Sequence, residues 1–451
     1  MIQMLTLSQT RGTTVTDCTL SKIEFPRCRG RRVEADFAGG DISSNGGALL
    51  LAAAERRMGL LSGLARRLDD RRQAGKVAHD LAALLRQRVF AVALGYEDVN
   101  DHGGLRDDLA LQTAVGRDRR LASPSTVGRL DRAADRAWAW AAHVTLVERF
   151  MASFDRPPEE LILDFDATDD AVHGRQVGRF FHGYYDHYCF LPLYVFCGDQ
   201  LLVSYLRPSN IDGAKHAWAI LALLVKRLRR AWPDVRIVLR ADSGFCRHKM
   251  LTWCERHDVG YIVGLAKNAR LNEAAAIGMD RAKALYAASG EKQRLFAELR
   301  YGAGTWSRRR RVIARLEHGP KGANPRYVVT NLEGDGQALY DGLYCQRGEM
   351  ENRIKEQQLD LFADRTSCHD WWPNQFRLIL ASLAYSLIEA IRRLALKGTE
   401  MARAQAGTLR LKLLKIGAVV IRNTRRVSLH LSTACPDQAL FHLAAARLKP
   451  G

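Results

Sequence analysis

The chain has 451 residues, 47% of them hydrophobic, and carries 68 lysine and arginine residues against 49 aspartate and glutamate residues, a formal net charge of +19. This length exceeds one ordinary core, so about two to four domains are expected, and the hydrophobic content excludes a largely disordered protein. So large a positive excess indicates a polyanionic partner, most commonly nucleic acid; a solvated basic surface in an arginine-rich proteome is the alternative.

Cysteine usage and apolar segments bear on the compartment. The nine cysteines are scattered without a C-x-x-C pair, which indicates reduced thiols in a cytosol and argues against a zinc ribbon. The longest apolar stretch, residues 376–396, is broken by Arg377, Glu389, Arg392 and Arg393. It therefore predicts a buried amphipathic helix and not a membrane span. We expect a cytoplasmic protein with no membrane contact and no secretory leader.

The pattern of the amino-terminal third predicts a short irregular segment followed by helices. Residues 1 to about 35 are polar, and beyond them leucine and alanine recur at three-four spacing with arginines between. Ser123, followed by a proline, predicts a helix start. A helix there with Arg129 and Arg132 facing outward could enter a groove of DNA. An ordinary surface helix explains the same residues equally well.

The pattern changes to strands after the pair Pro157-Pro158. Strands and helices are expected in turn. In chain order they are a strand to Asp166, aromatic-rich strands over 180–196 and 201–206, a helix over 214–231, a strand to Asp242, a short helix over 248–257 and a strand over 261–265. Three successive strands, a helix, and then a strand that carries an acid are the order of the RNase H-like fold, whose five-stranded sheet mixes antiparallel hairpins with parallel crossovers.

Two further segments have distinct patterns. Short strand-like runs with glycine-rich turns predict a β-rich insertion before the next helix, and residues 409–431 predict either a hairpin or a helix plus a strand. We therefore expect an α/β protein with six regions: an irregular segment 1–34, a helical DNA-binding and dimerisation region 35–157, the first part of the core 158–271, the β-rich insertion 272–340, the rest of the core 341–396, and a basic segment 397–451.

Three acidic residues stand at the ends or on the faces of these elements. Asp166 and Asp242 each close an apolar strand, and Glu351 lies in a helical pattern far downstream. Carboxylates are hard ligands suited to Mg²⁺ or Mn²⁺, and two such ions about 4 Å apart activate an attacking oxygen and stabilise the leaving one at a phosphodiester. Any one of these acids taken alone is more often a turn or surface residue.

The first acid has close competitors. Asp164 and Asp166 are two residues apart and share one face of a strand, and Asp166 is preferred because it lies at the strand end. Asp169 and Asp170 are expected to be solvated in the following turn. Asp242 precedes Ser-Gly, which predicts a tight turn that lifts its carboxylate clear of the sheet.

The third acid belongs to a helical stripe. Helical spacing places Tyr344, Arg347, Glu351, Lys355 and Gln358 on one face. The stripe is either an exposed salt-bridge ladder, worth about 0.3–0.5 kcal/mol per pair, or one metal ligand, Glu351, beside the phosphate-gripping Arg347 and Lys355.

These segments together resemble a known family. The spacing Tyr344-x2-Arg347-x3-Glu351 resembles the Y-R-E signature of bacterial DDE transposases related to the insertion-sequence-four group. The runs Asp166-Ala-Thr-Asp-Asp, Phe180-Phe-His-Gly-Tyr-Tyr and Glu351-Asn-Arg-Ile-Lys are similar to the insertion-sequence thirteen-eighty branch. The resemblance extends from about residue 32 to 450.

The resemblance implies a function and a set of roles. Asp166, Asp242 and Glu351 would form the catalytic triad and hold two Mg²⁺ ions, with Mn²⁺ as a substitute, while Tyr344 and Arg347 contact DNA near the cleaved end. The implied reaction is cleavage at transposon ends followed by strand transfer. The partners would be double-stranded DNA, both terminal inverted repeats and target, and a second copy of the chain at the bacterial nucleoid. The signature lysine is replaced by Gln358, which can bond a phosphate but lacks the charge.

The insertion contains one further candidate group. Trp306 precedes Arg308, Arg309 and Arg310, and an aromatic ring beside clustered cations can stack on a flipped base, a contact worth about 1–3 kcal/mol. Related transposases place a base-stacking tryptophan in such an insertion; a core tryptophan of an ordinary β-domain is the alternative.

Two other functions suit part of the pattern. One is an RNase H-fold nuclease that cuts without strand transfer, and the other is an inactive DNA-binding relic. The presence of all three acids disfavours decay, so a DDE transposase is the preferred hypothesis.

Overall fold

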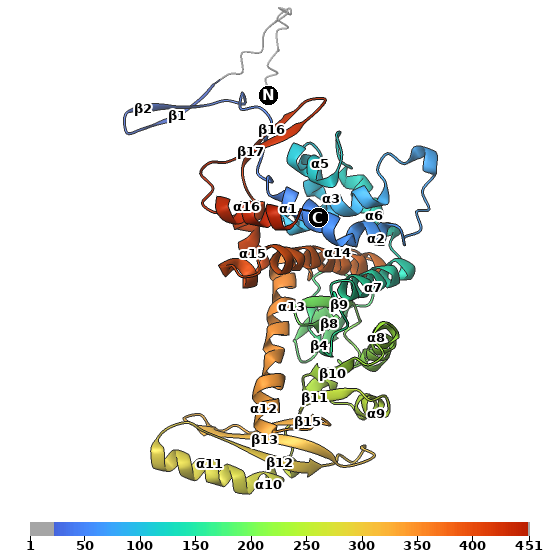
Figure 1. Cartoon of the computed structure of the whole chain (residues 1–451), viewed down its shortest axis with the longest axis vertical. Coiled ribbons are helices and arrows are strands. Elements are labelled where there is room, and N and C mark those ends of the chain that lie inside the picture. Colours follow the sequence, from blue (N-terminus) through green and yellow to red (C-terminus); the bar gives the residue numbers. More distant parts are fainter. Residues whose placement is uncertain (1–21, 450–451) are drawn as a thin grey trace, which may run out of the picture.

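The computed structural model describes residues 22–449; most of the irregular segment expected over 1–34 lies outside this range. The described chain is elongated (Figure 1), with a helical body at one end, a long mixed sheet through the middle and a sheet-and-helix tip at the other end. No helix in the described range combines the length and apolarity needed to span a membrane.

The helical body is built from both ends of the chain. Its amino-terminal helices are α1 Ala48–Met58, α2 Leu60–Ala65, α3 Leu81–Ala93, α4 His102–Leu105, α5 Leu109–Val115, α6 Pro124–Ala133 and α7 Arg136–Met151. Aspartates cap several of them: Asp80 accepts from the Ala83 amide and Asp135 from the Trp138 amide, as the preference for short acceptors at helix starts predicts. The expected helix after Ser123 is present as α6, with proline in its first turn.

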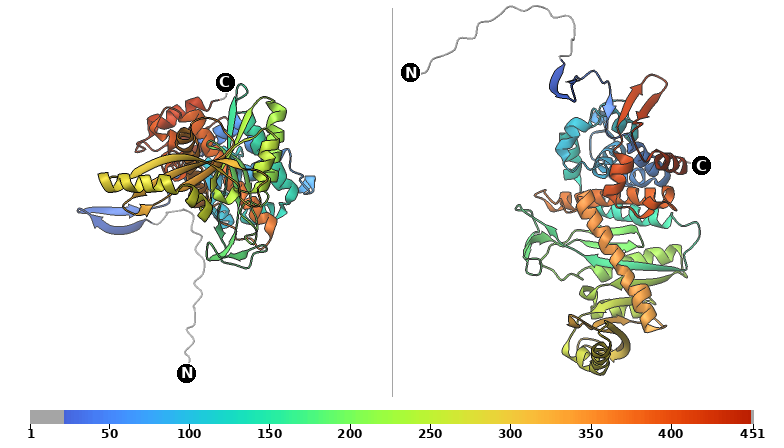
Figure 2. Two further views of the ribbon diagram at one scale, coloured as in Figure 1. Left: turned by 90° about the horizontal axis from the view of Figure 1, so that it is seen from below. Right: turned by 90° about the vertical axis from the view of Figure 1, so that its left-hand side faces the viewer.

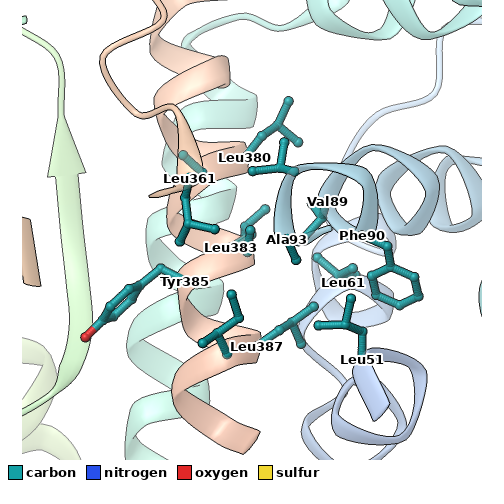
Figure 3. Packing of buried hydrophobic residues seen from close by; sticks show 14 of the residues in the cluster. Leu51, Leu61, Val89, Phe90, Ala93, Leu361, Leu380, Leu383, Tyr385 and Leu387 are labelled. Carbon is teal, nitrogen blue, oxygen red and sulfur yellow. The ribbon is translucent and has the colours of Figure 1, made fainter. Parts of the chain in front are cut away.

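The carboxyl-terminal helices complete this body. Helix α14, Trp371–Ala390, is buried along almost its whole length, so it is a central core helix and not an amphipathic surface one. Figure 3 shows its Leu380, Leu383 and Leu387 packed against residues of α1 to α3. Helix α15 Ala406–Leu409 lies beside it, and α16 Gln438–Arg447 packs against α1 and against the π-helical turn Ile391–Ala395 that continues α14. The regions 35–157 and 397–451 therefore share one hydrophobic core.

Two hairpins lie at the outer end of the body. Strands β16 Ala418–Arg422 and β17 Val427–Leu431 pair with the short β3 Ile42–Ser43, so the hairpin reading of residues 409–431 is correct, after a π-helical turn. Strands β1 Ile23–Cys28 and β2 Arg31–Ala35 form a second hairpin. The expectation of an irregular segment is wrong for these residues, because a two-residue turn at Arg29-Gly30, both at positive φ, joins the strands.

The strands and helices of the central sheet follow one another along the chain in the predicted order. Strands β4 Glu160–Ala167, β8 Leu193–Cys197 and β9 Gln200–Tyr205 are antiparallel neighbours, and β10 Arg236–Ala241 and β11 Gly260–Leu265 then join parallel to β4. Helices α8 Ala217–Ala231 and α9 His248–Arg256 are the crossovers. The aromatic run 180–196 is divided, since β5 Asp170–Ala171, β6 Phe180–His182 and β7 His187–Phe190 form a separate small sheet.

The segment expected as a β-rich insertion begins with helices. Helices α10 Ala269–Ala274 and α11 Ala276–Ser289 precede β12 Gln293–Tyr301, β13 Arg310–Gly319, β14 Gly322–Ala323 and β15 Arg326–Thr330. Strand β15 pairs with β11, so the insertion extends the central sheet, with the order β12-β13-β15-β11-β10-β4-β8-β9. The prediction of β-rich structure over 272–340 is therefore wrong for its first part.

A single helical column returns from the tip to the body (Figure 1, orange). It runs from α12 Gly336–Ala338 through a π-helical turn Leu339–Leu343 and a 3₁₀ turn Tyr344–Arg347 into α13 Gly348–Leu361. It crosses the sheet face beside β4 and β10. Irregular helical turns of this kind often occur at functional sites.

Candidate active site

Two acids lie side by side where β4 and β10 end. These parallel strands are in register, with Arg240 opposite Asp164 and Ala241 opposite Phe165. Phe165 and Ala241 point into the core. Because side chains alternate along a strand, the residues that follow them, Asp166 and Asp242, lie on the opposite face. The two carboxylates therefore lie together at one edge of the sheet.

Asp164 is a structural residue beneath this edge. Its side chain is 3% exposed and pairs with Arg240, whose Nη2 lies 2.7 Å from Asp164 Oδ2. Arg240 also donates from Nη1 to the carbonyl of Leu343 at 2.6 Å. The buried ion pair therefore fixes the helical column over the sheet, and Asp166 is the carboxylate left at the strand end.

The column brings the third acid to the same place. Arg347 lies between two carboxylates: its Nη1 is 3.4 Å from Asp166 Oδ2 and its Nη2 is 2.5 Å from Glu351 Oε1. The hydroxyl of Tyr344 lies over Gly264, where a Cβ atom would come within 2.7 Å of it and equally close to the amide of Ser243. A glycine inside strand β11 is the sequence signal for this close approach, and sequence reasoning missed it.

The three carboxylates and Arg347 influence the titration of the site. Burial raises the pKa of Asp166 to about 7; the charge of Arg347 opposes this rise, and repulsion from Asp242 and Glu351 adds to it. Burial also raises the pKa of Tyr344, again with Arg347 opposing and Asp242 adding. Among the described residues no three metal-ligating side chains converge closely enough to hold an ion as they stand. The space between Asp166 and Glu351 contains the guanidinium of Arg347.

The last two residues of the predicted helical stripe, Lys355 and Gln358, differ in their surroundings. Lys355 is exposed, whereas Gln358 donates from Nε2 to the Asp169 carbonyl at 2.9 Å and to Asp170 Oδ1 at 3.1 Å. Asp170 is fully buried and its pKa is raised by that burial. The expectation that it is solvated is wrong, because β5 draws the turn under the helix. Gln358 therefore holds the turn after Asp166 against α13.

This bond network leads to a stability prediction. Gln358→Leu removes the donor to the Asp169 carbonyl and to the Asp170 carboxyl, and an unsatisfied buried acceptor costs about 1–3 kcal/mol. We expect the free energy of unfolding in urea to fall by that amount. Gln346→Leu, on the exposed side of the same column, should change it by less than about 0.5 kcal/mol. Equal losses in the two variants would show that the bonds contribute nothing.

The insertion residues fall into two groups. Arg310 is 2% exposed, its Nε is 2.6 Å from Glu255 Oε1, and its guanidinium lies over the half-buried ring of Trp306. It is a buried scaffold residue, which corrects its expected role in contacting DNA. Arg308 is exposed and also reaches Glu255, at 3.1 Å, and Arg309 is exposed at the surface. Trp306 packs partly against the core and keeps part of its side chain exposed.

Comparisons with known proteins bear on the whole chain. Residues 25–450 match a family model described as transposase DDE domain, group 1. Among solved structures, the chain is similar to a piggyBac transposase in a synaptic complex with hairpin DNA, studied by cryo-EM. The TM-score is 0.39 at 13% identity, and the match covers 81% of this chain and 78% of that one. A search of curated protein sequences gives no match.

Proposed function

The chain belongs to the transposase DDE domain group 1 family, and from this premise we propose that it cuts DNA at transposon ends and joins those ends to target DNA in a metal-dependent reaction. One observation carries the proposal. Asp166, Asp242 and Glu351 come from three distant segments, and the register of β4 and β10 together with the contacts of Arg347 to Asp166 and Glu351 brings them to one edge of the sheet. A cluster of repelling carboxylates at a sheet edge suits a site for divalent cations.

The residues present fit such cations. Carboxylate oxygens are the ligands that Mg²⁺ and Mn²⁺ prefer, and the space between Asp166 and Glu351 already accepts a positive group, Arg347. Glu351 is 43% exposed, so its ion pair with Arg347 is screened by water and costs about 1 kcal/mol or less to open. We propose that Asp166, Asp242 and Glu351 hold two ions once that pair opens. When bound, the ions supply Lewis acidity to the attacking and leaving oxygens.

The neighbouring side chains would position the DNA. Released from the carboxylates, Arg347 has a fork of donors that matches a phosphate, and Tyr344 beside it contacts the same strand near the cleaved end. Lys355 faces solvent one turn beyond Glu351 and would grip a flanking phosphate. Arg308, Arg309 and the accessible edge of Trp306 would contact DNA from the insertion. Gln358 and Arg310 are engaged inside the protein and are left out of this set.

The fold supports the same reading. We propose that β9-β8-β4-β10-β11 is an RNase H-like core, to which the insertion adds an extension of the sheet. Duplex DNA would also lie along the helical body, where the exposed Arg129 and Arg132 of α6 line a groove of about 740 Å³ together with Arg71, Arg72 and Lys76. Two copies would pair the two transposon ends, and the insertion-sequence thirteen-eighty branch remains the proposed subgroup.

Strand transfer separates the proposal from its alternatives. Pre-cut end DNA with a free 3′-hydroxyl, incubated with the protein, Mg²⁺ and a supercoiled plasmid, should give joined products. A nuclease that only cuts would nick or linearise the plasmid without joining it, and an inactive relic would bind the ends and change neither DNA. Either of the last two results would contradict the proposal.

The raised pKa of Asp166 leads to a pH prediction. In the metal-free protein this carboxyl has a pKa of about 7, so below that pH a binding cation must displace its proton. We expect the apparent affinity for Mn²⁺ to fall by up to about tenfold per pH unit below 7 and to level off above it. Mn²⁺ titration followed by electron paramagnetic resonance measures this. An affinity that levels off already near pH 5, as for a carboxyl of ordinary pKa, would contradict the assignment.

A further inference from the structure

The β1–β2 hairpin projects from the helical body without packing on it. Every residue of both strands is exposed, and Figures 1 and 2 show the hairpin standing clear of the helices. The turn is tight, with Arg29 at φ 48° and Gly30 at φ 83°. A lone two-stranded ribbon is only marginally stable in water. A hairpin of this defined shape therefore gains stability when a partner covers it.

The hairpin has one apolar face and a cationic end. Register pairs Ile23 with Ala35 and Phe25 with Val33, so these four side chains share a face. At the turn the sequence is Arg-Cys-Arg-Gly-Arg-Arg, and its four arginines, Arg27, Arg29, Arg31 and Arg32, form no ion pair with any described residue, 22–449. Four guanidinium groups within six residues suit a dense polyanion.

A second cationic turn lies at the same end of the molecule. The β16–β17 hairpin also projects from this end of the helical body in Figure 1, and its turn carries the exposed Arg425 and Arg426. Both turns lie at the outer end of the helical body, and β4 and β10, at whose ends Asp166 and Asp242 lie, are on the other side of α14 (Figure 1). Any polyanion held here is bound away from the site of chemistry.

We propose that the β1–β2 hairpin is an arm that enters a groove of duplex DNA outside the cleavage site. The inference rests on the proposed function, which makes duplex DNA the substrate. A two-stranded ribbon fits the major groove, where arginine reads guanine and apolar groups contact thymine methyl groups. The arginines reach phosphates and base edges, and the face of Ile23, Phe25 and Val33 turns to the groove floor. A second copy of the chain would match the apolar face but leave the cations without a partner.

Salt dependence of binding tests the arm. In the full-length protein, R27Q/R29Q/R31Q/R32Q should flatten the slope of log affinity against log salt concentration for transposon-end duplex by about 3–4, because each phosphate contact contributes about 0.9. The matched control removes the same charge from exposed positions elsewhere, as K226Q/R230Q/R281Q/K283Q, and should leave the slope within about one of wild type. Because the arm packs on nothing, thermal unfolding should not change.

The outcomes are distinguishable. Equal slopes for wild type and the arm variant, with cleavage by wild type intact, would overturn the arm and leave the proposed function standing. If the wild-type protein neither cuts transposon ends nor joins them to target DNA, the proposed function is overturned, whatever salt slope the arm variant shows. If Phe25→Ser abolishes a dimer seen by sedimentation and the arm variant keeps its salt slope, the occupant is a second copy and the proposal falls.

Discussion

Asp242→Asn is expected to slow Mg²⁺-dependent cleavage of transposon-end DNA by about 10³-fold or more, since losing one ligand removes several kcal/mol of charge stabilisation and each 1.36 kcal/mol is a factor of ten. The fold should persist. Asp242 Oδ1 accepts from the Gly244 amide at 2.9 Å, and an asparagine oxygen can accept the same bond. The variant therefore separates metal binding from turn structure.

The matched control for this variant is Asp280→Asn, an exposed aspartate of α11, which should cleave at the wild-type rate. Affinity for DNA, measured without metal, should be unchanged or slightly higher in Asp242→Asn, because a negative charge has left the binding face. Cleavage by Asp242→Asn at the wild-type rate would show that the carboxylate cluster is misassigned.

Asp164→Ala is expected to lower the free energy of unfolding by about 3–5 kcal/mol, the typical loss when one partner of a buried ion pair is removed. The reason is the Arg240 guanidinium, whose side chain is 8% exposed and which would stay buried without its counter-charge. The double variant Asp164→Leu/Arg240→Met replaces the pair by apolar groups of similar volume and should regain most of that loss.

Urea unfolding followed by circular dichroism measures both effects, with Asp234→Ala at an exposed position as the control within about 0.5 kcal/mol of wild type. If the double variant loses as much stability as Asp164→Leu and Arg240→Met lose together when each is measured alone, the two side chains do not interact as a pair. The prediction would also fail if Asp164→Ala cost less than about 1 kcal/mol.

The sequence predicted the part of the site that depends on strand periodicity. Apolar runs that end in Asp166 and Asp242 indicated two strands, and the alternation of side chains placed Asp164 and Asp166 on one face. The structure adds the register that sets Arg240 opposite Asp164. Helical spacing likewise placed Tyr344, Arg347 and Glu351 on one side of the column, although its first turns are π- and 3₁₀-helical.

Features decided by distant segments were not predictable in this way. Asp170 looked like a turn residue, but it is buried and its Oδ1 accepts from Gln358, 188 positions away. The cationic run at 308–310 gave no sign that Glu255 would hold Arg310 inside. Helix α11 is rich in alanine, a strong helix former, so its sequence held a local signal that the β-rich prediction for 272–340 did not use.

The most direct measurement is anomalous diffraction from crystals of the protein with Mn²⁺. The proposed site predicts peaks within about 2.0–2.6 Å of carboxylate oxygens of Asp166, Asp242 and Glu351, with the side chain of Arg347 turned away from Glu351. Peaks that avoid these three carboxylates at saturating Mn²⁺, with the Arg347–Glu351 ion pair still closed, would contradict the proposed metal site.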